Sequence, residues 1–261
     1  MSSNNEVVPV ILCIAKLESN YIEEFVKYHL ALGFSHIFIY DNEDEPTYRK
    51  ILNKYNDNQI TVIHFPTKYQ QMNAYYHFIN NILFNSSITH VACIDLDEFI
   101  VLKQHNNIKD FINQFIIGDC QGIGMNWRFF GSSGKTEANT EEPLTKRFTL
   151  CQKDGNMHIK TLFKKDNFIG FNTMHDVLLS KGYIKNTNGQ IINGPFNHNI
   201  DLSYIQLNHY KCKTLEEFKY IRTRGQADRF VIGPDPVKDF VQYDVNDVED
   251  LTAYNFYSKL S

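Results

Sequence analysis

The most informative chemistry in the chain is the acidic run Asp95-Leu96-Asp97-Glu98, which follows the apolar segment Val91 to Ile94. We expect that segment to be a buried parallel strand, and ligands bind where the carboxyl ends of such strands open. In an extended backbone, residues two apart point to the same side, so Asp95 and Asp97 can converge on one ion. Carboxylate oxygens suit Mg²⁺ or Mn²⁺, which can neutralise a diphosphate leaving group. An ordinary acidic turn after a strand is the competing interpretation.

Three further segments carry groups that fit such a site. Asp41-Asn42 ends an expected strand, where a carboxylate can reach a base or ribose, although an Asx turn explains the same pair. The segment Asn208 to Lys213 places His209 beside lysines, as in a metal ligand next to phosphate-neutralising cations. A partly buried histidine with lysines on a solvated face is the alternative. The basic turn Arg222 to Arg229 can clamp phosphates or simply end a helix.

The only tryptophan in the chain, Trp127, stands before the loop Gly131-Ser132-Ser133-Gly134 and is a candidate contact for a substrate. Aromatic faces stack on sugar rings, and such a loop can order over a bound substrate. A core tryptophan followed by a plain turn fits equally well. His175-Asp176 is a candidate acid/base pair, although adjacent residues on a strand seldom face the same way.

Composition restricts the class of protein. The chain has 261 residues, 43% of them hydrophobic, and a net charge of −4, so it has no overall basic field for nucleic acid. The apolar run Val7 to Ala15 contains Pro9 and is too short to span a bilayer. Five cysteines without C-x-x-C spacing indicate reduced, buried thiols. We expect a soluble, cytoplasmic protein with no integral membrane segment and no nucleic-acid partner.

The elements that must position these residues alternate between strand and helix over the first hundred residues. Apolar runs predict strands at Pro9 to Ala15, His36 to Tyr40, Ile60 to Phe65 and Val91 to Ile94. Helical periodicity predicts a helix capped by Asn20 and ended by Gly33, a short helix opened by Pro46, and a helix from Lys68 to Phe84. The last should bury Tyr69, Met72, Tyr76, Ile79 and Leu83. This order predicts a Rossmann-like, mainly parallel sheet with helices on both faces.

Beyond residue 100 the pattern is looser and more mixed. It predicts strands at Gly122 to Phe130 and Ile159 to Lys164, a helix at Leu215 to Arg222 and a weaker helix at Asp247 to Leu260. We expect one α/β domain over residues 1–261. Its nucleotide-binding half covers about 7–100, and its second half, about 101–261, binds the acceptor and completes the metal site.

Taken in order, several blocks resemble glycosyltransferase family 92 and related family 2-like enzymes. They are Lys16-Leu17-Glu18, Tyr21 to Phe34, Ile39 to Asn42, Gln71, Asp95 to Phe99, Trp127 to Gly134, Lys160-Thr161, His175, Asn208 to Tyr210, Lys213-Thr214 and Arg224-Gly225. The resemblance covers residues 10 to 230, with Glu24-Phe25 where the family has Glu-Trp. It implies a GT-A fold and metal-dependent transfer of a sugar, usually hexosyl from a UDP-sugar, to a hydroxyl of a glycan or other acceptor. The compact chain is most similar to microbial or viral members that work in the cytosol.

The resemblance also implies roles for individual residues. Lys16, Glu18, Asp41, Gln71 and Asp95 would lie near the nucleotide, and Lys213 and Arg224 near its diphosphate. Asp95, Asp97 and His209 would hold Mn²⁺ or Mg²⁺. Trp127, Ser132, Ser133 and His175 would shape the acceptor side. An inverting mechanism also needs a base within reach of the acceptor hydroxyl, for which Asp176 and Asp228 are rivals beside His175.

Two other functions account for less of the sequence. A nucleotidyltransferase that makes the activated sugar also uses a doubly wound sheet, but it needs a glycine-rich loop after the first strand, and Ala15 to Ser19 has no glycine. A catalytically silent glycan- or nucleotide-binding module of the same fold remains the alternative. Retention of Asp95, Asp97 and His209 favours an enzyme over it.

Overall fold

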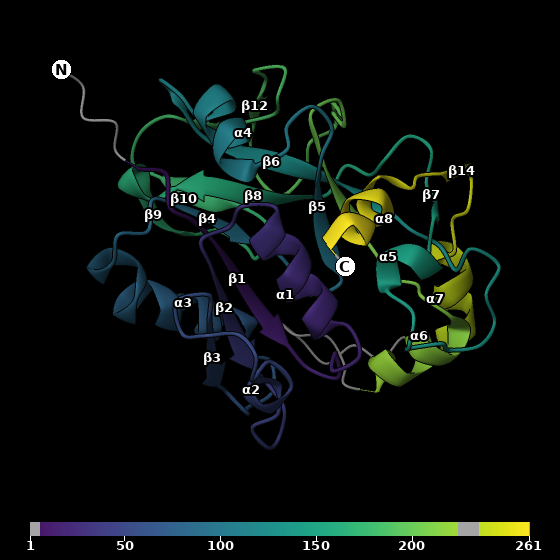
Figure 1. The fold of residues 1–261 in the computed structure, drawn as a ribbon. Helices are drawn as coiled ribbons and strands as arrows, with labels where there is room; N and C mark the ends of the chain where they lie inside the picture. Colours follow the sequence, from purple (N-terminus) through teal and green to yellow (C-terminus); the bar gives the residue numbers. More distant parts are fainter. Residues whose placement is uncertain (1–5, 224–234, 261) are drawn as a thin grey trace.

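The computed structural model describes residues 6–223 and 235–260, and a ten-stranded sheet organises them (Figure 1). Four strands from the first hundred residues are parallel and lie in the order β3-β2-β1-β4; they are β1 (Pro9–Ala15), β2 (His36–Asp41), β3 (Ile60–His64) and β4 (His90–Cys93). Their bounds match the predicted strands to within one residue, because long apolar runs with few polar interruptions mark strands buried on both faces.

The second half of the chain extends the same sheet. β8 (Ile159–Lys164) pairs antiparallel with β4, and the long β6 (Cys120–Phe129) pairs antiparallel with β8. The first part of β6 also pairs with β11 (Tyr183–Lys185), which carries β12 (Ile191–Ile192). Its last part pairs in parallel with β13 (Ile205–His209), whose other edge carries β5 (Glu98–Leu102). The ends of β5, β6 and β13 therefore come together.

Helices and a hairpin cover the two faces of the sheet. Alternate residues of β1 point to opposite faces: Ile11 and Cys13 join the core cluster of α1 (Ile22–Ala31), α2 (Tyr48–Ile51) and α4 (Ile108–Phe115). Val10 and Leu12 join the cluster under α3 (Gln71–Asn81) and the β9–β10 hairpin (Phe168–Phe171 and Val177–Leu179). These layers confirm the predicted α/β fold, with a mainly parallel sheet, helices on both faces and a mixed C-terminal half.

Short elements from the C-terminal half lie to the right of α1 in Figure 1. They are α5 (Leu144–Arg147), β7 (Leu150–Cys151), α6 (Leu215–Arg222), α7 (Pro236–Tyr243), β14 (Val248–Glu249) and α8 (Thr252–Tyr257). The described residues also form three turns of 3₁₀-helix, at Leu83–Asn85, Lys165–Asn167 and Ser258–Leu260.

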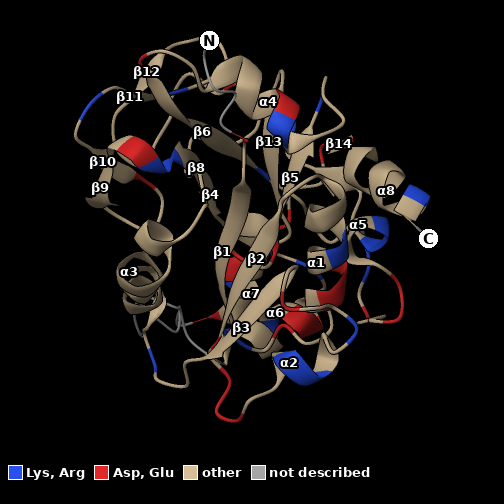
Figure 2. Cartoon of the chain, turned by 60° about the vertical axis from the view of Figure 1, so that its left-hand side comes forward, with Lys and Arg blue, Asp and Glu red and all other residues tan. Residues whose placement is uncertain are grey.

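A buried ion pair joins α5 to α6, where Figure 2 shows basic α5 beside acidic parts of α1 and α6. The Arg147 guanidinium donates two hydrogen bonds to the carboxylate of Glu217, at 2.8 and 2.6 Å. Tyr21 from the start of α1 donates a third to the same carboxylate. Glu217 also completes a capping box with Thr214, so one acidic residue fixes the start of α6 against two other elements.

Three details of the predicted helices are wrong. Asn20 does not cap α1, because the N–H groups of Tyr21 and Ile22 already donate to the carbonyl oxygen of Glu18 in a preceding turn. The predicted helix at Asp247 to Leu260 is divided into β14, α8 and a 3₁₀ turn. Here the carboxylate of Asp250 accepts the backbone N–H of Thr252 and starts α8.

The third difference concerns the buried face of α3. Tyr76 is 44% exposed and Tyr69 is 38% exposed, whereas Tyr75 and Phe78 are fully buried. The helix begins at Gln71, whose side-chain amide faces the acidic turn. That polar contact favours a rotation that buries Tyr75 instead of Tyr76, while Ile79 and Leu83 are buried as predicted.

The cysteines and the helix lengths complete the comparison with the sequence. All five cysteines are free and buried, as predicted. Among the helices within residues 6–223 and 235–260, none combines the length and the apolar character that crossing a membrane would need.

Candidate active site

The acidic run forms a turn between β4 and β5. The N–H of Glu98 donates to the carbonyl oxygen of Asp95 at 3.0 Å, and the Glu98 carboxyl accepts the N–H of Asp95 at 2.8 Å. The extended backbone assumed from the sequence is therefore wrong, because the chain reverses here to start β5. As a result Asp95 and Asp97 contact different partners.

Asp95 is held by two side chains from the parallel part of the sheet. Lys160 Nζ lies 2.9 Å from its Oδ2, and Gln71 Nε2 donates to its Oδ1 at 2.8 Å. Burial alone would raise the pKa of Asp95, but the Lys160 ammonium outweighs it and holds that pKa below its usual value. Lys160 is fully buried in β8, so its charge faces the acidic turn rather than water.

Asp97 faces a second pair of groups, which arrive from the end of β13. His209 Nε2 lies 3.7 Å from Asp97 Oδ1, and Lys213 Nζ lies 3.7 Å from Asp97 Oδ2. The pairing of β13 with β5 places His209 opposite Glu98, and the N–H of Tyr210 donates to the carbonyl oxygen of Asp97 at 2.9 Å. Backbone contacts of both strands thus set the position of this carboxylate against its two neighbours.

The charges at this site follow from burial. Burial lowers the pKa of His209 more than the nearby Asp97 raises it, so its imidazole is neutral and its nitrogen lone pair can bind an ion. Burial also raises the pKa of Glu98 well above its usual value. The Lys213 ammonium is fully buried, and within the described part of the chain it has no hydrogen-bond partner. Its charge is therefore available to an anionic ligand.

The donor set partly fits the divalent metal that the sequence implies. In the two described ranges, no group of three or more His, Cys, Asp or Glu side chains is arranged to hold a metal. Both oxygens of Asp95 are engaged by Lys160 and Gln71. Asp97 and His209 offer a carboxylate oxygen and a neutral imidazole, which suit Mn²⁺ or Mg²⁺ if substrate oxygens and waters fill the other positions.

The predicted nucleotide residues at the ends of β1 and β2 have structural contacts of their own. Asp41 accepts the N–H groups of Glu43, Thr47 and Tyr48 at 3.1, 2.7 and 3.0 Å, so it forms the turn before α2, as the Asx-turn interpretation expected. Lys16 forms an exposed ion pair with Asp44 at 2.9 Å.

A cavity of about 190 Å³ opens beside these residues. Its lining comes from the β1–α1 loop, the β2–α2 loop and α6: Leu17, Ser19, Asn20, Glu43, Thr47 and Tyr220. The loop that lines it contains buried Glu18, whose N–H donates to the Tyr48 hydroxyl at 3.1 Å. The nucleotide-binding roles of Lys16, Glu18 and Asp41 stay predictions, and this cavity is the space that they adjoin.

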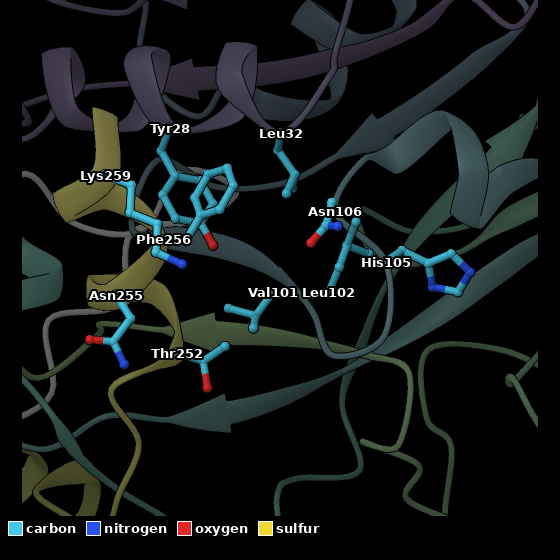
Figure 3. Close-up of a pocket in the computed structure, with 10 residues that line it drawn as sticks. All are labelled: Tyr28, Leu32, Val101, Leu102, His105, Asn106, Thr252, Asn255, Phe256 and Lys259. Atoms are coloured by element: carbon cyan, nitrogen blue, oxygen red, sulfur yellow. The ribbon is translucent and has the colours of Figure 1, made fainter. Parts of the chain in front are cut away.

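A second cavity, of about 250 Å³, lies between α1, β5 and α8 (Figure 3). Tyr28, Val101 and Phe256 are among its lining residues. It adjoins the far end of β5 from Glu98, so it is separate from the acidic turn.

Trp127 lies in β6 among three histidines. Its ring centroid is 4.5 Å from that of His209, 4.9 Å from that of His158 and 5.3 Å from that of His175. The ring is only 7% exposed. Trp127 therefore connects the acidic turn to the side where the sequence places the acceptor, as a packing partner for the histidines.

The loop after β6 is firmly held. The Ser132 N–H donates to Asp244 at 2.6 Å and the Ser133 N–H donates to Asn246 at 2.8 Å. The Ser133 hydroxyl accepts the N–H groups of Thr149 and Leu150, both at 2.9 Å. Side chains from the C-terminal segment therefore fix the position of this loop, and the acceptor roles of Ser132 and Ser133 stay predictions.

The candidate bases His175 and Asp176 point to different partners. His175 Nδ1 lies 2.9 Å from the carbonyl oxygen of Ile159, and burial lowers the pKa of His175 to about 4. The Asp176 carboxylate accepts hydrogen bonds from Asn172 and Thr173, which close its own turn. Asp228 and Arg224 lie outside the described residues, so the structure gives no position for either.

Lys160, Glu98 and His158 are the residues for which sequence reasoning proposed no role. The signal for Lys160 was present, since this lysine lies inside the strand Ile159 to Lys164, next to Ile159 and two residues before Leu162, where a buried side chain is expected. His158 gave no such signal, because its neighbours Trp127 and Phe196 lie far from it in the sequence.

The sequence has a relative of known family. The chain is 23% identical over 218 residues to a glycosyltransferase family 92 protein of Oryza sativa subsp. japonica, covering 80% of this chain and 34% of that protein. The chain thus spans about a third of the length of that relative.

Similarity to solved structures is weak. HddC from Yersinia pseudotuberculosis has a TM-score of 0.34 at 14% identity, with 77% of this chain and 76% of that one covered. The 4-diphosphocytidyl-2C-methyl-D-erythritol synthase of Anaerococcus prevotii has 0.31 at 11%, with 98% and 99% covered. A UDP-glucose pyrophosphorylase complexed with UDP-glucose has 0.30 at 10%, with 98% and 97% covered. The model of glycosyltransferase family 92 matches residues 8–224, which is most of the sequence, and the chain therefore belongs to that family.

Proposed function

We propose that this chain is a metal-dependent glycosyltransferase that moves a hexosyl group from a UDP-sugar to a hydroxyl of a glycan, with inversion at the anomeric carbon. The observation that carries the proposal is the position of Asp97, 3.7 Å from a neutral imidazole on one side and 3.7 Å from a buried ammonium on the other. A carboxylate and an imidazole can share a divalent ion, and an adjacent cation can bind the diphosphate.

The roles of the residues follow from these contacts. Asp97 and His209 would hold Mn²⁺ or Mg²⁺, which when bound stabilises negative charge on a departing diphosphate. Lys213 would neutralise a phosphate oxygen, since its ammonium is buried without a hydrogen-bond partner among the described residues. Lys160 would keep Asp95 ionised and fixed at the edge of the site.

The donor nucleotide would extend from this site toward the 190 Å³ cavity beside the β1–α1 loop. That cavity has the polar side chains of Ser19, Asn20 and Thr47 and the aromatic ring of Tyr220 on its walls. Hydroxyl and amide groups can bind base and ribose edges, and an aromatic ring can stack on a base.

Transfer by a single displacement would invert the anomeric carbon. The acceptor oxygen forms a bond to that carbon as the bond to the diphosphate breaks, and the hydroxyl proton passes to a base. Among the candidates that the structure describes, His175 lies against Trp127, whereas both oxygens of Asp176 are used within its turn. With Nδ1 bonded to the carbonyl oxygen of Ile159, His175 presents Nε2 as the proton acceptor.

Nucleotide binding tests the proposal directly. We expect UDP to raise the melting temperature only when Mn²⁺ is present, because a ligand of the native state stabilises it by mass action. Asp97→Asn should abolish this shift. Asp57→Asn, which removes a carboxylate from an exposed ion pair with Arg49, is the matched control and should keep it. An equal shift for Asp97→Asn and wild type would refute the metal site. Release of UDP from UDP-sugars should then separate an enzyme from a silent binding module.

A further inference from the structure

A row of aromatic rings runs from the candidate active site to the surface. His209 contacts Trp127 at 4.5 Å between ring centroids, Trp127 stacks on His158 at 4.9 Å, and His158 meets Phe196 edge-on at 4.8 Å. Exposure increases along the row, from 5% at His209 and 7% at Trp127 to 39% at Phe196. The inner end of the row is thus part of the acidic site, and its outer end is open to solvent.

The outer end of the row is rigidly supported. The Asn197 side chain donates to the side-chain oxygen of Asn126, which is fully buried in β6. The Asn126 amide in turn donates to the backbone carbonyls of Asn156 and Asn197, and its oxygen also accepts the N–H of Asp201. The backbone of His158 pairs with that of Phe196 in an isolated bridge. These buried amides therefore hold the backbone next to Phe196, whose side chain is exposed.

The row also offers a hydrogen-bond acceptor. The Asn156 side-chain oxygen accepts the backbone N–H of His158 at 3.0 Å, which identifies that atom as oxygen. His158 Nδ1 lies 2.7 Å from the same oxygen and must therefore carry the proton. Nε2 is then an acceptor, and in the described part of the chain no hydrogen bond to it is formed.

We propose that Phe196 and His158 form a subsite that binds a pyranose ring of the acceptor glycan. The proposal rests on the proposed function, since the row begins at the site where transfer would occur. The C–H groups on one face of a pyranose pack on an aromatic ring, and its hydroxyl groups need acceptors such as His158 Nε2. A protein partner would favour a wider apolar surface, whereas here histidines alternate with the apolar rings.

Saturation-transfer-difference NMR with methyl glycosides of glucose, galactose, mannose and N-acetylglucosamine tests the subsite. Spectra are recorded with and without UDP and Mn²⁺. We expect at least one glycoside to receive saturation in the wild type, and Phe196→Ala to weaken its binding about tenfold, as the loss of one aromatic stacking partner predicts. Phe196→Trp should restore binding, and Phe196→Leu should not. Phe84→Ala, at a phenylalanine that is 56% exposed on another surface, should leave it unchanged.

The outcomes separate the subsite from the rest of the site. Loss of glycoside signals in Phe196→Ala, with the UDP–Mn²⁺ thermal shift of the wild type retained, supports the proposal. Two results overturn it: equal NMR signals in Phe196→Ala and wild type, or no saturation transfer from the wild type to any glycoside. If UDP fails to bind while the Phe196-dependent signals persist, the proposed function fails and the sugar subsite stands.

Discussion

Replacing Arg147 by methionine tests how the C-terminal elements hold the site in place. The Arg147 side chain is 1% exposed and that of its partner Glu217 is 7% exposed, with two hydrogen bonds at 2.8 and 2.6 Å. Removing one member of a buried ion pair costs about 3–5 kcal/mol, because the other charge stays buried. Glu217 keeps hydrogen bonds from Tyr21 and Thr214, so we expect the lower end of that range, about 3 kcal/mol.

Urea unfolding with two controls makes this number informative. Arg49→Met removes an ion pair to Asp57 whose side chains are 45% and 90% exposed, and it should cost at most about 1 kcal/mol. The double variant Arg147→Met, Glu217→Gln should recover part of the lost free energy of unfolding, because no buried charge then remains. If Arg147→Met is no more destabilising than Arg49→Met, the argument from burial is wrong.

The same pair predicts a pH dependence. Burial would raise the pKa of Glu217, but hydrogen bonds from Arg147, Tyr21 and Thr214 outweigh it and lower that pKa. A lowered pKa in the folded state gives stability that is present above about pH 4.5, the ordinary value of the group, and lost as the pH falls toward the folded-state pKa. Arg147→Met should reduce this loss of stability at low pH. Glu217 also caps α6 through Thr214, and Lys213 directly precedes Thr214, so the variant should also weaken the UDP binding proposed above.

Three further substitutions test separate contacts. Burial lowers the pKa of His29 to about 3. Since the unfolded chain binds a proton at this residue and the folded chain does not, the free energy of unfolding should fall by about 2 kcal/mol between pH 7 and pH 5. His29→Gln should remove this difference in urea titrations at pH 7 and pH 5. Gly33 has φ 101°, and an added Cβ would lie 2.4 Å from the Asn107 side chain, so Gly33→Ala should cost about 2 kcal/mol in thermal unfolding. Asp250→Asn weakens buried ion pairs to Lys103 and Arg128 and should cost about 2–4 kcal/mol by the same assay.

The parallel part of the sheet was predictable because β1, β2 and β4 are buried at nearly every position. A strand such as β1 needs apolar residues at every position, so its ends are visible in the sequence. Helix details were less visible, since they depend on contacts from elsewhere. The preceding turn at Glu18 replaced a side-chain cap on α1, and the contact of Gln71 with Asp95 set the buried face of α3.

The candidate site was predictable by residue type and not by geometry. Asp95, Asp97 and His209 could be selected because carboxylates at a strand end and a histidine beside lysines are unusual in a core. The sequence could not show that Asp95 contacts Lys160 while Asp97 contacts His209. These contacts depend on a turn in the acidic run and on strands paired across more than a hundred residues. The hydrogen bonds that fix Ser132 and Ser133 likewise come from Asp244 and Asn246, more than a hundred residues later in the sequence.

The pairing of β13 explains why one site draws on both halves of the chain. β13 is antiparallel to β5 and parallel to the end of β6, so its last residue, His209, lies opposite both Glu98 and Phe129. Moving β13 by one residue along β5 would turn His209 away from Asp97, because neighbouring strand residues point to opposite faces. The register of this strand therefore decides whether Asp97 has an imidazole beside it. Asp250→Asn, which removes a contact with Gln206 on β13, should therefore weaken the metal binding proposed for Asp97 and His209, as measured by the Mn²⁺-dependent thermal shift.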